Sequence, residues 1–258
     1  MCQIYELFGK TERLFFLRLI FCMDYWQYFI DTSQDVNGTG KVCNKVEYKT
    51  VRYGKNKKHD ANYCVLFDSA RNVIQVHFEK TSTKQDWKDN FNFPQKQYDT
   101  FLWDNKPLTL YVHSGWGTMY RAVKHDMHID FEQMQQEHPG AIVEVIGWSL
   151  GSALAQLCVQ DLNYRYGRKA DCYTFGSVKP WFYTDRRTAA YLKSCWRTCM
   201  NFCHRSDIVT YQPPFPGYRM LNRIDLGKFV PAGLLDPWQY HTHYDDEKLY
   251  ENFPPQTY

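Results

Sequence analysis

Short apolar runs alternate with segments of helical periodicity along most of this chain, and that alternation limits the fold more than any other feature. Six runs predict strands: "YCVLFD", "NVIQVHFE", "LTLYVHSG", "AIVEVIGW", "DCYTFGS" and "CMNFCHRSD". Apolar periodicity predicts helices at 118–137, 150–166 and 185–195, and an amphipathic helix at 10–30. Strands that alternate with helices favour an α/β fold, with a mostly parallel central sheet and helices on both faces.

The length of 258 residues suffices for one large domain with a well-buried core. We expect a single domain over 1–258, in which 1–59 form an N-terminal extension of helix and loops with a strand near 42–50. The 31 basic and 28 acidic residues give a net charge of +3, which is too weak a bias to predict a nucleic-acid partner. The chain contains no stretch of 18 apolar residues, so we expect no transmembrane segment.

Nine cysteines, an odd number, are spread along the chain and do not form the compact framework of a secreted disulfide-rich domain. The run "LFFLRLIFCM" is interrupted by Arg18 and has no small-residue cleavage site, so it is a poor signal peptide. A cytoplasmic or otherwise intracellular location with reduced thiols is therefore expected. Cys195, Cys199, Cys203 and His204 could suggest zinc, but their spacing across a predicted helix-to-strand junction scatters the thiols. We predict no metal ligands here.

The stretch "AIVEVIGWSLGSALAQL" places Ser149 between Gly147 and Gly151, where a predicted strand meets a predicted helix. A G-x-S-x-G turn in this context is typical of a nucleophile elbow, in which a strained turn exposes the serine and requires small neighbours. The N-terminus of the following helix points its N–H groups at the serine, where they can stabilise negative charge. The alternative is an ordinary tight strand-to-helix turn.

Further segments support the elbow, and together they carry a resemblance. The segments "VHFEKTSTKQDWKDNF", "YVHSGW", "GWSLGSALA", "YTFGSVKPW" and "HRSDIVTYQPP" resemble, in this order, motifs of the class 3 lipases, the fungal-type triacylglycerol lipase family. The resemblance covers about residues 60–253. It implies an α/β-hydrolase fold and a Ser-Asp-His triad that needs no cofactor or metal.

The resemblance also implies the partners of Ser149. Asp207, in "HRSDIV", matches the acid of the family. The base must follow it in the chain, and "WQYHTHYDDEKLY" offers two histidines. His243 stands four residues before Glu247, as the closing pattern of the family requires, and is our predicted base. His241 is the second candidate, since either imidazole could do the chemistry.

Two backbone donors should stabilise the oxyanion. One is the N–H of Leu150, directly after the nucleophile, and by resemblance the other is Thr81. The family's Arg-Gly before this threonine is replaced by Glu79 and Lys80, which restricts the backbone there. Trp148 replaces a family histidine and should alter packing beside the elbow without removing a catalytic group.

The segment 83–93 corresponds to the lid of the resembling lipases. Its aromatic residues Trp87 and Phe91 are spaced i, i+4, so a short helix would have one narrow apolar stripe among charges. A lid with such a stripe would close on the acyl cleft in water and open at a lipid surface. The alternative is a surface helix that packs Trp87 permanently.

The expected activity is serine-dependent hydrolysis of carboxylic esters of lipids through an acyl-enzyme, with a lipid ester as substrate and transient contact with lipid surfaces. A phospholipase A1 or an esterase of soluble esters would use the same triad. A non-catalytic binding protein that keeps the hydrolase fold is the alternative of another class, and the lost Arg-Gly beside Thr81 is its best support.

Overall fold

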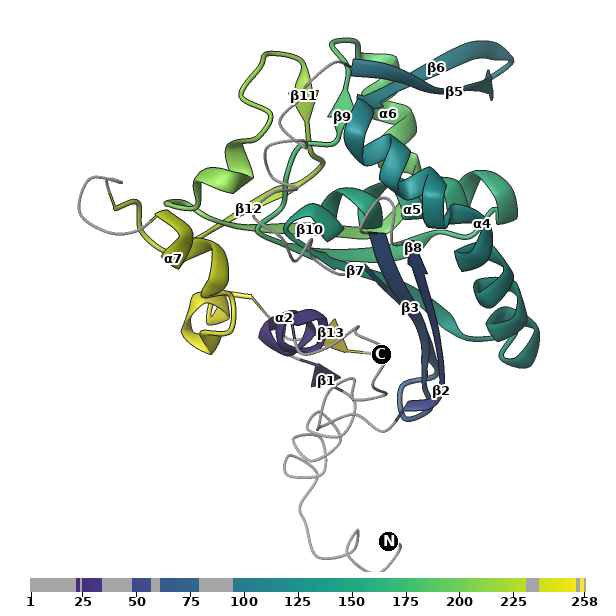
Figure 1. The fold of residues 1–258 in the computed structure, drawn as a ribbon, viewed down its shortest axis with the longest axis horizontal. Helices are drawn as coiled ribbons and strands as arrows, with labels where there is room; N and C mark the ends of the chain where they lie inside the picture. Colours follow the sequence, from purple (N-terminus) through teal and green to yellow (C-terminus); the bar gives the residue numbers. More distant parts are fainter. Residues whose placement is uncertain are drawn as a thin grey trace, which may run out of the picture.

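The computed structural model describes residues 22–23, 25–33, 48–56, 61–78, 95–230, 237–253 and 256–257. Within this part of the chain, seven strands form a central sheet (Figure 1). Their order is β12 (Arg223–Leu226), β10 (Trp196–His204), β8 (Ala170–Phe175), β7 (Ile142–Trp148), β4 (Val73–Phe78), β3 (Ala61–Asp68) and β2 (Tyr48–Asn56). The strands from β12 to β4 are parallel to one another. β3 pairs antiparallel with β4, and β2 pairs antiparallel with β3. The predicted α/β-hydrolase fold with a mostly parallel sheet is confirmed.

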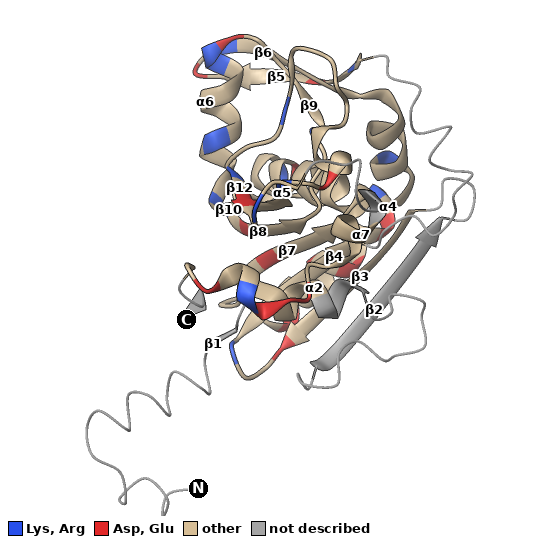
Figure 2. Ribbon diagram, turned by 90° about the vertical axis from the view of Figure 1, so that its left-hand side faces the viewer, with Lys and Arg blue, Asp and Glu red and all other residues tan. Residues whose placement is uncertain are grey.

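Helices cover both faces of the sheet. On one face lie α4 (Ser114–Glu137) and α5 (Leu150–Tyr166), which pack on β3 and β7, while α6 (Arg186–Cys195) packs beside α5. On the other face, α2 (Tyr25–Ser33) packs on β7 and β8 (Figure 2). Alternate residues of β7 serve the two faces, because Val143 and Val145 belong to one core and Ile146 and Trp148 to the other.

A second, antiparallel sheet lies beside the helices, in the order β11 (Tyr218–Arg219), β9 (Trp181–Phe182), β6 (Lys106–His113) and β5 (Gln95–Trp103). The predicted strand "LTLYVHSG" is β6, so it exists but lies outside the central sheet. It forms a hairpin with β5, which the sequence analysis missed. Asp104 and Asn105 make the turn with φ of 53° and 56°, a conformation that Asn and Asp tolerate well.

The N-terminal segment contributes to the body of the fold. Of the predicted helix 10–30, only its last part coincides with α2, and 10–21 lie outside the described residues. The strand expected near 42–50 is β2, which begins at Tyr48 and forms an edge of the central sheet. Near the C-terminus lie α7 (Pro237–Thr242), the 3₁₀ helix η2 (Glu247–Tyr250) and β13 (Gln256–Thr257), which pairs with β1 (Cys22–Met23). No helix in the described ranges is long and apolar enough to span a membrane.

A buried polar cluster under α2 connects β4 to β7. The Glu144 carboxylate on β7 accepts hydrogen bonds from the Tyr28 hydroxyl (2.7 Å), Gln75 Nε2 (2.6 Å) and Arg71 Nη1 (3.3 Å). His77 on β4 is fully buried, and its Nε2 lies 3.1 Å from Gln75 Oε1. Burial, together with the Arg71 charge, lowers the pKa of His77 to about 3, so its imidazole is neutral in the folded protein.

Candidate active site

Ser149 occupies the turn between β7 and α5. Its backbone has φ of 57° and ψ of −123°, a strained conformation for a residue with a side chain, and its N–H donates to the Phe175 carbonyl (2.9 Å). A Cβ on Gly147 would lie 2.3 Å from the Gly151 carbonyl oxygen. The first glycine of the motif is therefore required because strand and helix backbones pack directly against each other, as in a nucleophile elbow.

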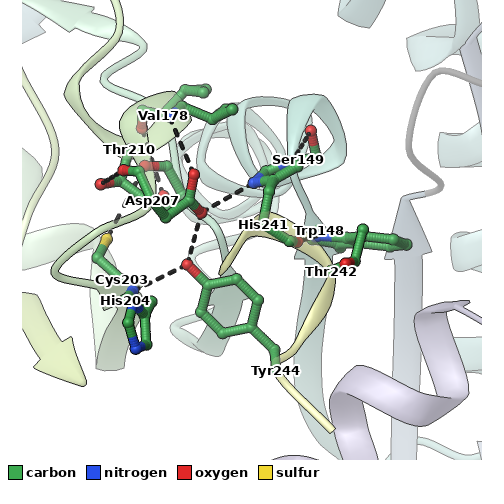
Figure 3. Close-up of polar contacts among 12 residues, drawn as sticks. Trp148, Ser149, Val178, Cys203, His204, Asp207, Thr210, His241, Thr242 and Tyr244 are labelled. Carbon is green, nitrogen blue, oxygen red and sulfur yellow. Dashed lines mark hydrogen bonds and ion pairs between the residues drawn. The ribbon is translucent and has the colours of Figure 1, made fainter. Parts of the chain in front are cut away.

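The serine hydroxyl is the first member of a hydrogen-bonded series of three side chains (Figure 3). His241 Nε2 lies 2.7 Å from Ser149 Oγ, and His241 Nδ1 lies 2.8 Å from Asp207 Oδ2. All three side chains are buried. Because the Asp207 carboxylate can only accept, Nδ1 carries the proton and Nε2 presents a lone pair to the serine hydroxyl. The arrangement can therefore remove the serine proton as the oxygen attacks.

The prediction of His243 as the base is wrong in this structure. His243 is exposed, whereas His241 lies in the last turn of α7, with Trp148 Nε1 donating to its carbonyl (3.1 Å). Helix α7 packs against the 3₁₀ helix η1 (Ile208–Tyr211), which directly follows Asp207. The position at which α7 ends therefore determines which imidazole reaches Ser149. The four-residue spacing from His243 to Glu247 does not indicate where the helix ends. Trp148 packs beside the elbow, with its ring centroid 4.9 Å from that of Phe29 and 5.9 Å from that of His241.

Tyr244 contributes to the site, and the sequence analysis did not identify it. Its hydroxyl donates to Asp207 Oδ2 (2.7 Å) and accepts from the N–H of His204 (2.9 Å). Burial and the Asp207 charge raise the pKa of Tyr244 well above its usual range, so the hydroxyl remains a donor. Asp207 Oδ1 accepts from the N–H of Val209 (2.9 Å). Both carboxylate oxygens are therefore fixed, and the carboxylate is oriented toward His241.

Gly176 follows β8 and lies against the imidazole. Its φ is 54°, and its N–H donates to the Phe202 carbonyl (3.0 Å). A Cβ at this position would lie 2.7 Å from His241 Cε1, 2.8 Å from His241 Nδ1 and 3.3 Å from Asp207 Oδ2. The backbone of Gly176 thus forms one wall of the space that the imidazole occupies.

Of the two predicted oxyanion donors, the structure describes Leu150 but not Thr81. Leu150 is the first residue of α5, directly after the N-cap residue Ser149, so its N–H is one of the N–H groups without a partner inside the helix. Thr81, Trp87 and Phe91, together with the whole segment 79–94, lie outside the described residues. Both oxyanion donors and the lid therefore stay predictions.

Six cysteines in the described ranges are free thiols, and Cys195, Cys199 and Cys203 are among them. Cys195 ends α6, and the other two lie along β10, where Cys203 is buried and Cys199 is half-buried. In the described ranges, no group of three or more Cys, His, Asp and Glu side chains is arranged to hold a metal ion. The three thiols are thus divided between the end of a helix and two positions of a strand.

A strained serine at a strand-to-helix elbow, bonded through histidine to a buried aspartate on this fold, defines a serine hydrolase of the α/β-hydrolase class. A profile of the class 3 lipases matches residues 75–216, more than half of the chain. The chain therefore belongs to the class 3 lipase family, as its motifs predicted, and is a serine-dependent hydrolase of lipid carboxylic esters.

Solved structures agree with this fold. A Rhizomucor miehei triacylglyceride lipase is 19% identical, with a TM-score of 0.65 over 85% of this chain and 82% of that chain. A mutant form of MDLA from Penicillium cyclopium is 18% identical, with a TM-score of 0.59 over 87% and 83%. A mono- and diacylglycerol lipase from Aspergillus oryzae is 21% identical, with a TM-score of 0.55 over 69% and 63%. At these identities the likeness shows a shared fold.

Proposed function

We propose that Ser149, His241 and Asp207 form the catalytic triad of an acylglycerol lipase. The observation that carries the proposal is the continuous contact from Ser149 Oγ to His241 Nε2 (2.7 Å) and from His241 Nδ1 to Asp207 Oδ2 (2.8 Å). These distances suit proton transfer from the hydroxyl to the imidazole and stabilisation of the imidazolium by the carboxylate.

In the first half-reaction, Ser149 Oγ attacks the ester carbonyl and His241 takes its proton. The N–H of Leu150 and, by family resemblance, Thr81 hold the oxyanion. His241 then protonates the leaving alcohol, and an acyl-enzyme remains on Ser149. In the second half-reaction a water molecule gives a proton to His241 and attacks the acyl carbonyl; the bond from the acyl carbon to Ser149 Oγ then breaks, His241 returns the proton to Oγ, and the fatty acid is released. The chemistry requires no cofactor.

The acylglycerol substrate is supported by the family and by the similar structures, which include a triacylglyceride lipase and a mono- and diacylglycerol lipase. The test compares emulsified tri- and diacylglycerols, a phospholipid and p-nitrophenyl butyrate as substrates. We expect hydrolysis of the acylglycerols, and a loss on the order of 10⁴-fold or more in Ser149→Ala. Hydrolysis of phospholipid alone would favour a phospholipase A1, and hydrolysis of the soluble ester alone would favour an esterase.

The lid is a separate part of the proposal. If residues 83–93 cover the site in water, activity should rise sharply once an insoluble ester forms an interface, and Trp87→Ser should impair emulsion hydrolysis more than soluble-ester hydrolysis. Equal losses on both substrates, with no interfacial rise in the wild type, would leave this segment as a packed surface helix.

A further inference from the structure

Two loops beside the triad form one continuous surface. The first, 205–211, begins just before Asp207 and includes η1, which packs against the helix that carries His241. The second, 227–230, follows β12. Ser206 joins them, because its Oγ accepts from the N–H of Val230 (2.7 Å) and donates to the Lys228 carbonyl (3.4 Å). His204 connects the second loop to α7, because its ring stacks on Tyr240 with 4.6 Å between the centroids, and a Cβ on Gly227 would lie 2.4 Å from His204 Nε2.

Apolar side chains project from both loops. Ile208 is 41% exposed, Tyr211 is 46% exposed and Phe229 is 65% exposed. Single exposed apolar residues are common on protein surfaces, but three on two joined loops beside a catalytic site form an apolar group that water solvates poorly. The Tyr211 hydroxyl donates to the Arg205 carbonyl (3.0 Å), which holds the aromatic ring at the surface.

Basic side chains lie on the same two loops and next to Tyr211. Arg205 and Lys228 are exposed, and neither forms an ion pair with any residue that the structure describes. The Arg223 guanidinium lies over the Tyr211 ring, 4.7 Å from its centroid, and is paired with Asp225 (2.7 Å). Arg205 and Lys228 add two positive charges against the single negative charge of the buried Asp207, so the surface has a net positive charge.

We propose that this docking face, formed by Arg205, Ile208, Tyr211, Lys228 and Phe229, seats the enzyme on an anionic lipid surface. Exposed aromatic and aliphatic side chains enter the boundary between headgroups and acyl chains, while basic side chains contact anionic headgroups. The proposal deepens the proposed function, because docking through loops next to Asp207 brings the triad to the surface that contains its ester substrate. The lid is not required for the contact.

The charge contribution can be measured by vesicle co-sedimentation in a Ser149→Ala background, which prevents hydrolysis of the vesicle. Vesicles of phosphatidylcholine alone are compared with vesicles that also contain phosphatidylserine. Each basic residue near an anionic surface contributes about fivefold in affinity, so Arg205→Gln/Lys228→Gln should weaken binding by roughly 25-fold. The matched control, Arg186→Gln/Lys193→Gln, removes two exposed charges from α6 and should bind normally. High salt should weaken the parent and the control but have little effect on the docking-face variant.

The apolar contribution is measured in the same assay. Phe229→Ser should weaken binding several-fold, whereas Leu102→Ser, which removes a side chain that is 72% exposed on β5, should not. In the protein that retains Ser149, Phe229→Ser should leave the rate of p-nitrophenyl butyrate hydrolysis unchanged, because Phe229 is not part of the triad. A thermal unfolding scan confirms that each variant is folded.

The following results would overturn the proposal: equal binding to neutral and anionic vesicles, no binding to either, or docking-face variants that bind as the controls do. A concentration-dependent dimer that both docking-face variants abolish would instead assign the surface to a second copy of the chain. Failure of the proposed function is distinguishable, since it would appear as absent ester hydrolysis in the Ser149 protein while vesicle binding persists.

Discussion

Gly176→Ala should displace the His241 imidazole and lower kcat. The new Cβ would lie 2.7 Å from His241 Cε1, so ordinary contact at about 3.5 Å requires the ring or the backbone to move by roughly 0.8 Å. The imidazole is fixed by Ser149 on one side and Asp207 on the other, so it cannot move without lengthening both hydrogen bonds. A displacement of this size near reacting atoms lowers kcat by about 10²-fold.

Gly167→Ala is the matched control for this variant. Gly167 caps α5 with φ of 63°, close to the 54° of Gly176, but an added Cβ would have no neighbour within 4 Å. Both alanines are strained at positive φ by about 1 kcal/mol or more, which lowers the melting temperature by about 2–4 °C per kcal/mol. The control should therefore lose stability and keep its activity.

The assay combines thermal unfolding with kcat and KM on p-nitrophenyl butyrate, a soluble ester that needs no interface. Gly176→Ala should lower kcat at temperatures where the protein is fully folded. Our reasoning would be refuted if Gly176→Ala retained wild-type kcat, or if Gly167→Ala lost as much activity as Gly176→Ala. The second result would mean that helix stability, and not the contact with His241, limits catalysis.

Two further predictions concern Tyr244 and His77. Tyr244→Phe removes a hydrogen bond to the Asp207 carboxylate, worth about 1.5–3 kcal/mol, and should lower kcat roughly tenfold or more with KM unchanged; an unchanged kcat would reduce Tyr244 to a packing role. His77, whose pKa burial lowers to about 3, contributes stability that is present above pH 6.5 and lost as pH falls toward 3, because only the unfolded state takes up the proton. In urea unfolding between pH 6 and 4, His77→Gln should flatten the pH slope by about 1.4 kcal/mol per unit, and parallel slopes would contradict the prediction.

Four strands of the parallel part, β4, β7, β8 and β10, were predictable because most of their residues are buried, whereas the short and partly exposed β12, "RIDL", was missed. β7, "IVEVIGW", is an apolar run interrupted only by Glu144, which has a clear signal in the sequence. β5, "QKQYDTFLW", belongs to the second sheet and is mostly exposed at its start, so it has no such run. β6 has the composition of a central strand, and only its pairing with β5 and β9 shows that it lies elsewhere. Composition predicts strands better than it predicts their partners.

The site was predictable to the extent that it depends on local geometry. The elbow at Ser149 follows from two glycines between a strand and a helix, and Asp207 follows from a family motif after an apolar run. The base was not fixed in this way, because His241 and His243 both follow Asp207 and differ by only two positions. Helix α7 ends between them, at Thr242, and burial of the following Tyr244 turns His243 outward. The burial of Tyr244, which distinguishes the two histidines, is a property of the fold and has no local signal in the sequence.

The central claim is that Ser149 is the nucleophile and that His241 activates it. Its most direct test is the rate of covalent labelling by a fluorophosphonate probe, with the modified peptide identified by mass spectrometry, in the wild type, His241→Ala and His243→Ala. We predict that wild type and His243→Ala label at Ser149 at similar rates, and that His241→Ala labels on the order of 10⁴-fold more slowly. Rapid labelling of His241→Ala together with loss of labelling in His243→Ala, or modification of a residue other than Ser149, would contradict the account.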